Sequence, residues 1–431
     1  MENQDTLIPK IAKCGLINIG NTCFMNSVLQ VMIHNKLLFM FYIKINKNNE
    51  ELLTNFDESI EFSPNGKGQY EEFLHEAGAQ RLGDKIRRAK KLGKNDEVSI
   101  NSSDHKKFMV NSFSNTFSEL LNRIIYKGNS TYTPSDFRRV LSTKFSHFTS
   151  GRQHDAHELL TCVLDEICEE TGVESSLEIT NPPEEVEQYI KYTKEIKRDY
   201  GNAENTEEKE QILAKFKKFK LDNPIMVKQH EYIQYKMSIH QPKYNLIIGK
   251  MRTFTLDKRT CNSCGSDNFS FDSTNVLNIP INGDTLEECL DYYIKERETN
   301  ESKCKNCRKV CKMNITTNIV SASPVLYISL ERFLKQNIRF VQKNTKNIKI
   351  PEYLDITKYC DFIINKSNCK YKLKGIVNHY GMYGGGHYTA YCLDMIDDKT
   401  WYEFDDSRVS IIEDFEIDES SAYILLYESI L

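Results

Sequence analysis

A cysteine at the start of a predicted helix constrains this chain more than any other feature of its sequence. The stretch from Gly15 to Asn21 is rich in glycine and asparagine, which tolerate the turns of a loop. The residues after Cys23 follow an apolar pattern with helical spacing. Cys23 is therefore expected in the first turn of a helix, where free backbone N–H groups favour negative charge and lower the pKa of a thiol. Such a thiol is a candidate nucleophile.

The simplest alternative is a small buried cysteine, because isolated free cysteines usually behave as small apolar residues. Two downstream stretches argue against it. His387 follows a flexible run of three glycines at the head of an alternating strand, and Asp405 and Asp406 end the next predicted strand. Cysteine, histidine and aspartate supply a nucleophile, a base and a carboxylate that fixes the imidazole. Asn18, a short loop before Cys23, is placed to donate to an oxyanion.

These two stretches resemble the motifs of the ubiquitin-specific proteases, the papain-like cysteine deubiquitinases. The resemblance covers nearly the whole chain, interrupted by inserts. It implies an α+β fold shaped like a hand, with a helical thumb, an antiparallel-sheet palm and zinc-bearing β fingers. It also implies that Cys23 is the nucleophile, His387 the base, Asp405 the third member of the triad and Asn18 an oxyanion donor. Asp406 is sometimes assigned a share of the work of Asp405 in that family.

The resemblance predicts a single catalytic domain over residues 14–429. Within a charged insert at residues 169–223, two amphipathic segments on either side of Gly201-Asn202 predict a helical hairpin. Packing of this hairpin against the parent domain and docking of a partner both remain open. Short alternating strands are expected from Gln229 onward. The expected regions are the thumb at 14–168, a charged helical insert at 169–223, the fingers at 224–320 and the palm at 321–429.

A third motif, which runs from Gln153 to Glu158, opens another predicted helix. By pattern alone its polar residues are explained by helix capping. The motif also matches a further box of the same family, usually Gln-Gln-Asp-Ala-His-Glu, although His154 stands where a glutamine is common. The resemblance implies that Gln153 and Asp155 contact the extended C-terminal tail of the substrate. Tyr388, next to the predicted base, is expected to contact it as well.

Two C-x2-C knuckles provide four thiolates for a tetrahedral Zn²⁺ site: Cys261, Cys264, Cys304 and Cys307. The long separation of the knuckles means that strands lie between them, and the resemblance places this site at the tip of the fingers. A closed four-cysteine site has no open coordination position, so the zinc is expected to be structural and no catalytic cofactor is expected. Reduced cysteines without metal are the alternative. Cys311 lies close by but breaks the spacing.

The composition excludes several classes of protein. The net charge of −4 does not suit a polyanion-binding domain, so a zinc-ribbon nucleic-acid protein is disfavoured. No apolar run approaches the roughly 18 residues of a membrane span, and the polar N-terminus does not suit a secretory signal. The 13 scattered cysteines argue against a disulfide framework. We therefore expect an intracellular protein, cytoplasmic or nuclear or both, with no membrane partner. A basic run between Lys85 and Lys94 indicates a solvated insert rather than a targeting signal.

The predicted function is thiol-dependent hydrolysis of isopeptide and peptide bonds at the C-terminal glycine of ubiquitin. The implied partners are ubiquitin and ubiquitinated proteins, and the oligomeric state remains open. A catalytically inactive ubiquitin-binding scaffold would carry the same motifs. A protease for a ubiquitin-like modifier is a further alternative, because the same triad serves any Gly-Gly isopeptide.

Overall fold

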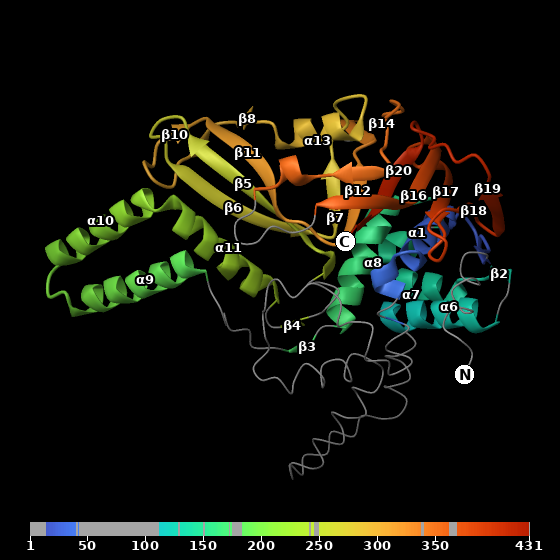
Figure 1. Cartoon of the computed structure of the whole chain (residues 1–431), viewed down its shortest axis with the longest axis horizontal. Coiled ribbons are helices and arrows are strands. Elements are labelled where there is room, and N and C mark those ends of the chain that lie inside the picture. Colours follow the sequence, from blue (N-terminus) through green and yellow to red (C-terminus); the bar gives the residue numbers. More distant parts are fainter. Residues whose placement is uncertain are drawn as a thin grey trace, which may run out of the picture.

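Figure 1 shows the chain as a computed structural model. The polar segment 44–104, with the basic run between Lys85 and Lys94, lies outside the residues that the structure describes. No helix among the described residues is both long and apolar enough to cross a membrane. The described residues are 14–39, 42, 112–127, 130–149, 151–171, 173–174, 183–240, 243–244, 250–337, 340–361 and 369–430.

A helical lobe forms around α1 (Cys23–Ile33), in which every residue is buried. The apolar stripe expected after Gln153 is present in α8 (Ala156–Thr171), which buries Leu160, Val163, Leu164 and Ile167 against the core. The strand β1 (Gly15–Leu16) comes directly before α1 in the chain and pairs in parallel with β2 (Thr131–Tyr132). The other helices of this lobe are α6 (Phe113–Lys127), α7 (Ser135–Lys144) and the 3₁₀ turn η3 (Ser146–Thr149).

An eight-stranded palm sheet packs against α1, which lies on β16, β17 and β18. Its order is β19-β18-β17-β16-β20-β12-β7, and β15 pairs with β16. The strands are β7 (Val276–Ile279), β12 (Val325–Leu330), β15 (Tyr353–Asp355), β16 (Lys370–Met382), β17 (Gly385–Leu393), β18 (Trp401–Asp405), β19 (Arg408–Ile412) and β20 (Ala422–Ser429), with the 3₁₀ turn η4 (Thr357–Tyr359) after β15.

The palm strands from Val325 onward pair antiparallel as expected, and the sheet gains one parallel strand at its edge from the segment expected in the fingers. β7 pairs in parallel with β12, with Tyr327 opposite Val276. A parallel pair needs a long crossover, and the chain between these strands supplies one by passing through α13 (Leu286–Ile294) and the finger strands. A capping box of Thr285 and Glu288 starts α13. α13 then covers the second apolar core, on the face of the palm sheet opposite α1.

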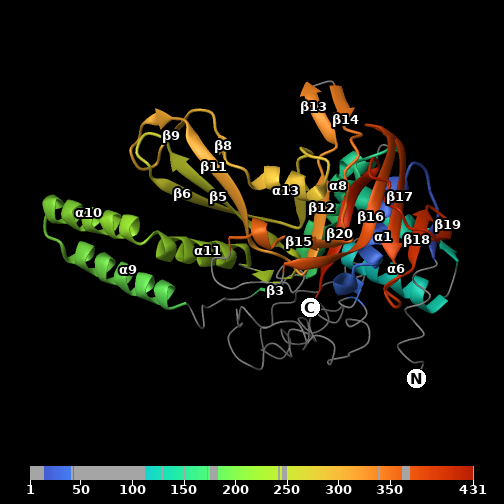
Figure 2. The same ribbon diagram turned by 45° about the horizontal axis from the view of Figure 1, so that its top comes forward.

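The fingers form a separate four-stranded sheet with the order β6-β5-β11-β8 (Figure 2). A small hairpin of β9 and β10 joins it at the tip. Alternating burial along β11 matches a sheet with one covered face. The strands are β5 (Thr253–Cys261), β6 (Asp267–Thr274), β8 (Arg297–Glu298), β9 (Ser302–Lys303), β10 (Val310–Cys311) and β11 (Met313–Ser321).

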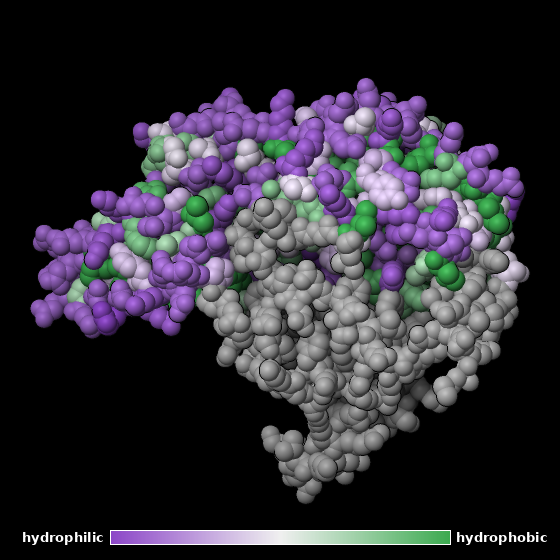
Figure 3. All heavy atoms as spheres, viewed as in Figure 1, coloured by the Kyte–Doolittle hydropathy of each residue, from purple (hydrophilic) through white to green (hydrophobic). Residues whose placement is uncertain are grey.

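The hairpin expected across Gly201-Asn202 is present as α9 (Glu184–Asn202) and α10 (Thr206–Asp222), which project away from the sheets in both ribbon views (Figures 1 and 2). Polar side chains cover most of the visible face of this projection (Figure 3).

The prediction that strands begin at Gln229 is wrong. That segment belongs to the helix α11 (Pro224–His240), and the finger strands begin later, with β5 at Thr253. Proline suits the first helical position, and Tyr232 is buried against Phe254 and Phe271 of the finger sheet. Tertiary packing thus favours a helix here. A short pair, β3 (Val173–Glu174) and β4 (Lys243–Tyr244), flanks this region.

A β13–β14 hairpin (Phe333–Asn337 and Phe340–Lys343) rises from the palm sheet (Figure 2). Its base is held by Arg332, which is fully buried. The guanidinium donates to the carbonyl oxygens of Ala422 and Glu419 at 2.6 Å each, and to those of Asn344 and Lys346 at 3.1 and 3.0 Å. One side chain therefore joins the hairpin base to the turn before β20.

Candidate active site

The predicted nucleophile is the first residue of α1 and is 2% exposed. Gln153 donates to the sulfur from Nε2 at 3.8 Å. Burial raises the pKa of the Cys23 thiol; the backbone N–H of Tyr388 lowers it, and the negative charge of Asp406 raises it again. The lowered pKa expected from the helix N-terminus is therefore not found in this state. Burial dominates, because the thiolate loses more hydration than the backbone N–H groups replace.

The predicted base and its carboxylate come together on neighbouring strands. His387 lies in β17 and Asp405 ends β18, and Nε2 of the imidazole is 2.6 Å from Oδ1 of the carboxylate. This contact engages Nε2 and leaves Nδ1 on the other side of the ring. Among the described residues no hydrogen bond joins His387 to Cys23. The structure therefore shows the imidazole bound to Asp405 but not to the thiol.

Asn18 is held from both ends of its amide. Its oxygen accepts hydrogen bonds from the backbone N–H groups of Gly20 and Thr22, at 3.0 and 3.1 Å, and from the Thr22 hydroxyl at 3.2 Å. Because these are donors, the amide nitrogen must face the other way, where it donates to Oδ2 of Asp406 at 2.9 Å. One of the two Nδ2 hydrogens is used in this bond. The second is available to an oxyanion.

The three residues expected to bind substrate lie around the same point but differ in exposure. Gln153 donates from Nε2 to the carbonyl oxygen of Gly386, directly before His387. Asp155 is half-buried, and its Oδ1 accepts from the backbone N–H of His157 and from the hydroxyl of Tyr423, both at 2.7 Å. Tyr388 is only 4% exposed. Sequence reasoning missed Tyr423; its place beside Asp155 follows only from the pairing of distant segments.

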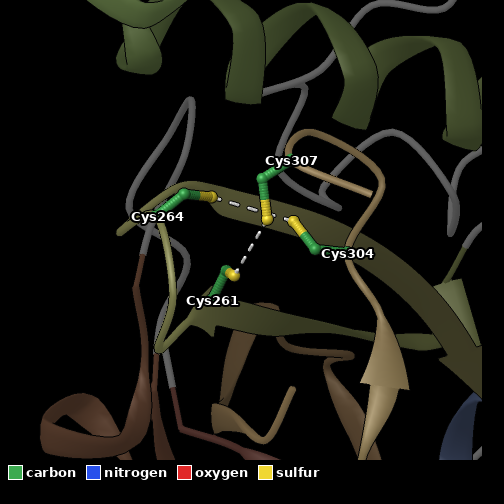
Figure 4. Close-up of side chains that lie close together, drawn as sticks. All are labelled: Cys261, Cys264, Cys304 and Cys307. Atoms are coloured by element: carbon green, nitrogen blue, oxygen red, sulfur yellow. Dashed lines mark hydrogen bonds between the residues drawn. The ribbon is translucent and has the colours of Figure 1, made fainter. Parts of the chain in front are cut away.

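The four knuckle cysteines meet at the tip of the finger sheet, with their sulfurs turned toward one another (Figure 4). All four sulfurs lie within 4.8 Å of one another, and the pairs Cys261–Cys307 and Cys264–Cys304 are each separated by 3.9 Å. Four sulfurs at about 2.3 Å from a tetrahedral metal ion would be about 3.8 Å apart. The cluster therefore has the size of a tetrahedral thiolate site that could hold zinc.

The surroundings favour the thiolate at two of the four cysteines, Cys264 and Cys304, whereas burial raises the pKa of the Cys261 thiol. Ser266 lies 3.1 Å from the Cys264 sulfur, and its hydroxyl and backbone N–H lower the pKa of that thiol to about 6. The backbone N–H of Asn306 donates to the Cys304 sulfur at 3.3 Å. A fifth thiol, that of Cys311, lies 3.4 Å from the Cys261 sulfur but outside the mutual set of four.

Comparison with known proteins points to one family. The family model described as "Ubiquitin carboxyl-terminal hydrolase" matches residues 14–427. A probable ubiquitin carboxyl-terminal hydrolase of Acanthamoeba polyphaga mimivirus is 26% identical over 434 residues, covering 96% of this chain and 89% of that protein. Ubiquitin carboxyl-terminal hydrolase 2 of Bos taurus is 25% identical over 437 residues, covering 99% of this chain and 57% of that protein.

A solved structure shares the fold. The structure titled "Structure of the SAGA Ubp8/Sgf11/Sus1/Sgf73 DUB module bound to ubiquitin aldehyde" matches with a TM-score of 0.60 and 18% identity. The match covers 100% of this chain and 72% of the other. At this identity it establishes the α+β architecture alone.

Proposed function

The chain belongs to the ubiquitin carboxyl-terminal hydrolase family, as a ubiquitin-specific protease and cysteine-type deubiquitinase, and from this premise we propose that Cys23, His387 and Asp405 perform the hydrolysis. The bonds cleaved are isopeptide and peptide bonds after the C-terminal glycine of ubiquitin. The observation that carries this assignment is the packing of α1 against β17. It brings the helix that begins with Cys23 onto the strand that bears His387, which is already hydrogen-bonded to Asp405.

Proton transfer from the thiol to the imidazole begins the reaction. Nδ1 of His387 takes the proton while Nε2 stays bound to Asp405, so the carboxylate stabilises the imidazolium that forms. The Cys23 thiolate attacks the carbonyl carbon of the terminal glycine. His387 then returns the proton to the leaving lysine amine. Water hydrolyses the remaining thioester, with His387 acting as the base.

The oxyanion of each tetrahedral intermediate is stabilised by Asn18. The amide of Asn18 is oriented before substrate binds, and its remaining Nδ2 hydrogen and the backbone N–H of Cys23 are the proposed donors. Preoriented donors are effective because they need no reorganisation when charge develops. Asp406 supports this role by holding the amide, whereas Asp405 serves the imidazole.

The Cys23 thiol is 2% exposed, so the Gly-Gly tail must reach it in extended form. We assign Gln153 to contact with that tail, because its amide lies between the Cys23 sulfur and the Gly386 carbonyl. Asp155 and Tyr388 form the floor beneath it, with Asp155 fixed by the hydroxyl of Tyr423. The partners of the protein are then ubiquitin and ubiquitinated proteins, in the cytoplasm, the nucleus or both, where the thiol stays reduced.

The fingers are proposed to hold one Zn²⁺ through Cys261, Cys264, Cys304 and Cys307. The sulfur separations and the hydrogen bonds to the sulfurs support this assignment. With four protein ligands the ion has no open position, so it stabilises the tip of the finger sheet and takes no part in the reaction.

Reaction of the purified protein with ubiquitin bearing a C-terminal thiol-reactive group tests the proposal. We expect a covalent adduct on the wild type and none on Cys23→Ala. If neither protein forms an adduct and the wild type does not hydrolyse a fluorogenic ubiquitin amide, the result would instead support an inactive scaffold. Adducts formed with a probe made from another modifier, but not with ubiquitin, would identify a protease for a ubiquitin-like protein.

A further inference from the structure

We infer that Asn26 is a positioning residue for the oxyanion side of this reaction, acting through Asp406 on Asn18. Asn26 lies on α1, one turn after the nucleophile, and touches neither the thiol nor the imidazole in the structure. The inference rests on the proposed function, because it concerns the same tetrahedral intermediates. It adds a residue whose part in the reaction is to hold a carboxylate in place.

The Asn26 side chain joins two segments that are far apart in the sequence. It is 2% exposed, and Nδ2 donates to Oδ1 of Asp406 at 2.7 Å and to the carbonyl oxygen of Leu16 at 3.1 Å. Both amide hydrogens are therefore used. Leu16 in turn donates its backbone N–H to the carbonyl oxygen of Asp406 at 2.8 Å. Helix α1, strand β1 and the turn after β18 thus meet at this one amide.

The carboxylate of Asp406 passes this constraint on to Asn18. Asn26 occupies one carboxylate oxygen and Asn18 the other. Since the oxygen of Asn18 is already engaged by backbone donors, its amide can turn only as far as the Asp406 carboxylate allows. The result is an ordered series of contacts from the helix to the carboxylate and then to the oxyanion donor.

The backbone around this series leaves little room for adjustment. Asp406 adopts φ of 50°, in the left-handed region, within the tight turn that joins β18 to β19. A Cβ atom on Gly15 would lie 2.3 Å from the carbonyl oxygen of Ser407, so β1 and this turn are in direct backbone contact. The backbone of the turn is therefore held by β1, and Asn26 sets the orientation of the Asp406 carboxylate.

Asn26 also leaves a buried oxygen unsatisfied, which an apolar residue at this position would not do. Oδ1 of Asn26 has no hydrogen-bond partner among the described residues. A buried polar atom without a partner destabilises a fold. Asparagine is then explained by what its two N–H groups hold: one binds the Asp406 carboxylate and the other the Leu16 carbonyl oxygen.

A kinetic comparison of Asn26→Ala with Gln30→Ala tests the inference. Gln30 is the matched control: it lies one turn further along α1, is 1% exposed, donates to the carbonyl oxygen of Cys14 at 2.8 Å and also has an unsatisfied oxygen. It does not contact Asp406. Both variants remove a buried amide from one helix, so both are expected to lower Tm, and only Asn26→Ala is expected to lower kcat.

With a fluorogenic ubiquitin amide we expect Asn26→Ala to lose about 10- to 10²-fold in kcat with KM within about 2-fold, somewhat less than the loss of an oxyanion donor itself. In an Asn18→Ala background the same substitution should cost no more than about 2-fold, because its effect passes through Asn18. If Asn26→Ala does not fold, Asn26→Asp replaces it in the test. This variant keeps the size of the side chain but faces Asp406 with a like charge, and it should lose at least about 10-fold in kcat.

Three results would overturn the inference: full kcat in Asn26→Ala, an equal loss of kcat in Gln30→Ala, or undiminished loss in the Asn18→Ala background. Failure of the proposed function would look different. In that case the wild type itself would neither hydrolyse the fluorogenic amide nor form the thiol adduct.

Discussion

Gly386 and Tyr380 are in such close contact that a Cβ atom on Gly386 would lie 2.0 Å from the Tyr380 carbonyl oxygen. The contact is part of the β16–β17 ladder, in which Tyr380 faces His387 and Met382 faces Gly385. The glycine run was expected to form a flexible loop before the base. Instead, Gly385 and Gly386 belong to β17, and the backbone directly before His387 is fixed by its neighbour strand.

The contact allows two roles of the glycines to be tested separately: fixing the backbone before His387 and gating the Gly-Gly tail. Gly386→Ala should lower kcat/KM by about 10²-fold, because the clash shifts His387 and small displacements of a catalytic group have effects of that size. Gly385→Ala is the control, since its Cβ would meet no atom within 4 Å. We expect it to keep kcat and KM within about 2-fold. If Gly385→Ala instead raised KM strongly, the run would act as a gate over the Gly-Gly tail.

Asn18→Ala should reduce kcat by about 10²–10³-fold, the usual effect of removing one oxyanion donor, with little change in KM. The physical reason is that Asn18 binds the charge that develops in the intermediate and not the ground-state tail. Steady-state kinetics with the fluorogenic ubiquitin amide measures both constants, and binding of ubiquitin to Cys23→Ala/Asn18→Ala checks that affinity is kept. Near-wild-type turnover would contradict the assignment.

Asp406→Asn should change thiol reactivity and turnover in opposite directions. The carboxylate raises the pKa of Cys23, so removing its charge should lower that pKa and increase the thiolate fraction at neutral pH. The midpoint of the pH profile for alkylation of Cys23 by iodoacetamide is then expected at lower pH than in the wild type. Turnover should fall, because Asn18 loses the charged acceptor that orients it. An alkylation profile that did not move, or moved to higher pH, would show that Asp406 does not act on the thiol.

Removal of the metal should destabilise the fingers without changing the catalytic thiol directly. Cys304→Ser removes a fully buried ligand, and we expect loss of the bound Zn²⁺ with a fall in Tm on the order of 5–10 °C. Cys311→Ser is the matched control, because Cys311 contacts Cys261 but lies outside the set of four. It should retain one Zn²⁺ per chain by elemental analysis. Equal zinc loss in both variants would move Cys311 into the ligand set.

Local features of the fold could be predicted from sequence. The loop before Cys23 and the helix after it depend on turn-forming residues and apolar spacing within one stretch, and α1 begins at Cys23 as expected. The two helices around Gly201-Asn202 were expected for the same reason. The close spacing within each cysteine knuckle likewise shows in the sequence. In all these cases the residues that decide the structure are neighbours in the chain.

Other features depended on distant segments. The segment of α11 was expected to be a strand, and its burial against Phe254 and Phe271 in the finger sheet made it a helix. β7 lies in the segment that was expected to form the fingers, but it joins the palm sheet in parallel beside β12 after a crossover through α13. Propensity is a weak preference, and packing against residues far along the chain overrides it.

The sequence by itself determined which groups are present at the site: a thiol at a helix start, an imidazole, paired carboxylates and a loop asparagine. Only the tertiary structure decided what each group does. Asp405 meets His387 while Asp406, the next residue, is bound by Asn18 and Asn26, although an oxygen of each carboxylate lies within 4.8 Å of a ring nitrogen of His387. The tertiary structure also raises the pKa of Cys23, through burial of the thiol and the nearby charge of Asp406. Burial and charge at one atom depend on every segment packed around it, and those segments come from both ends of the chain.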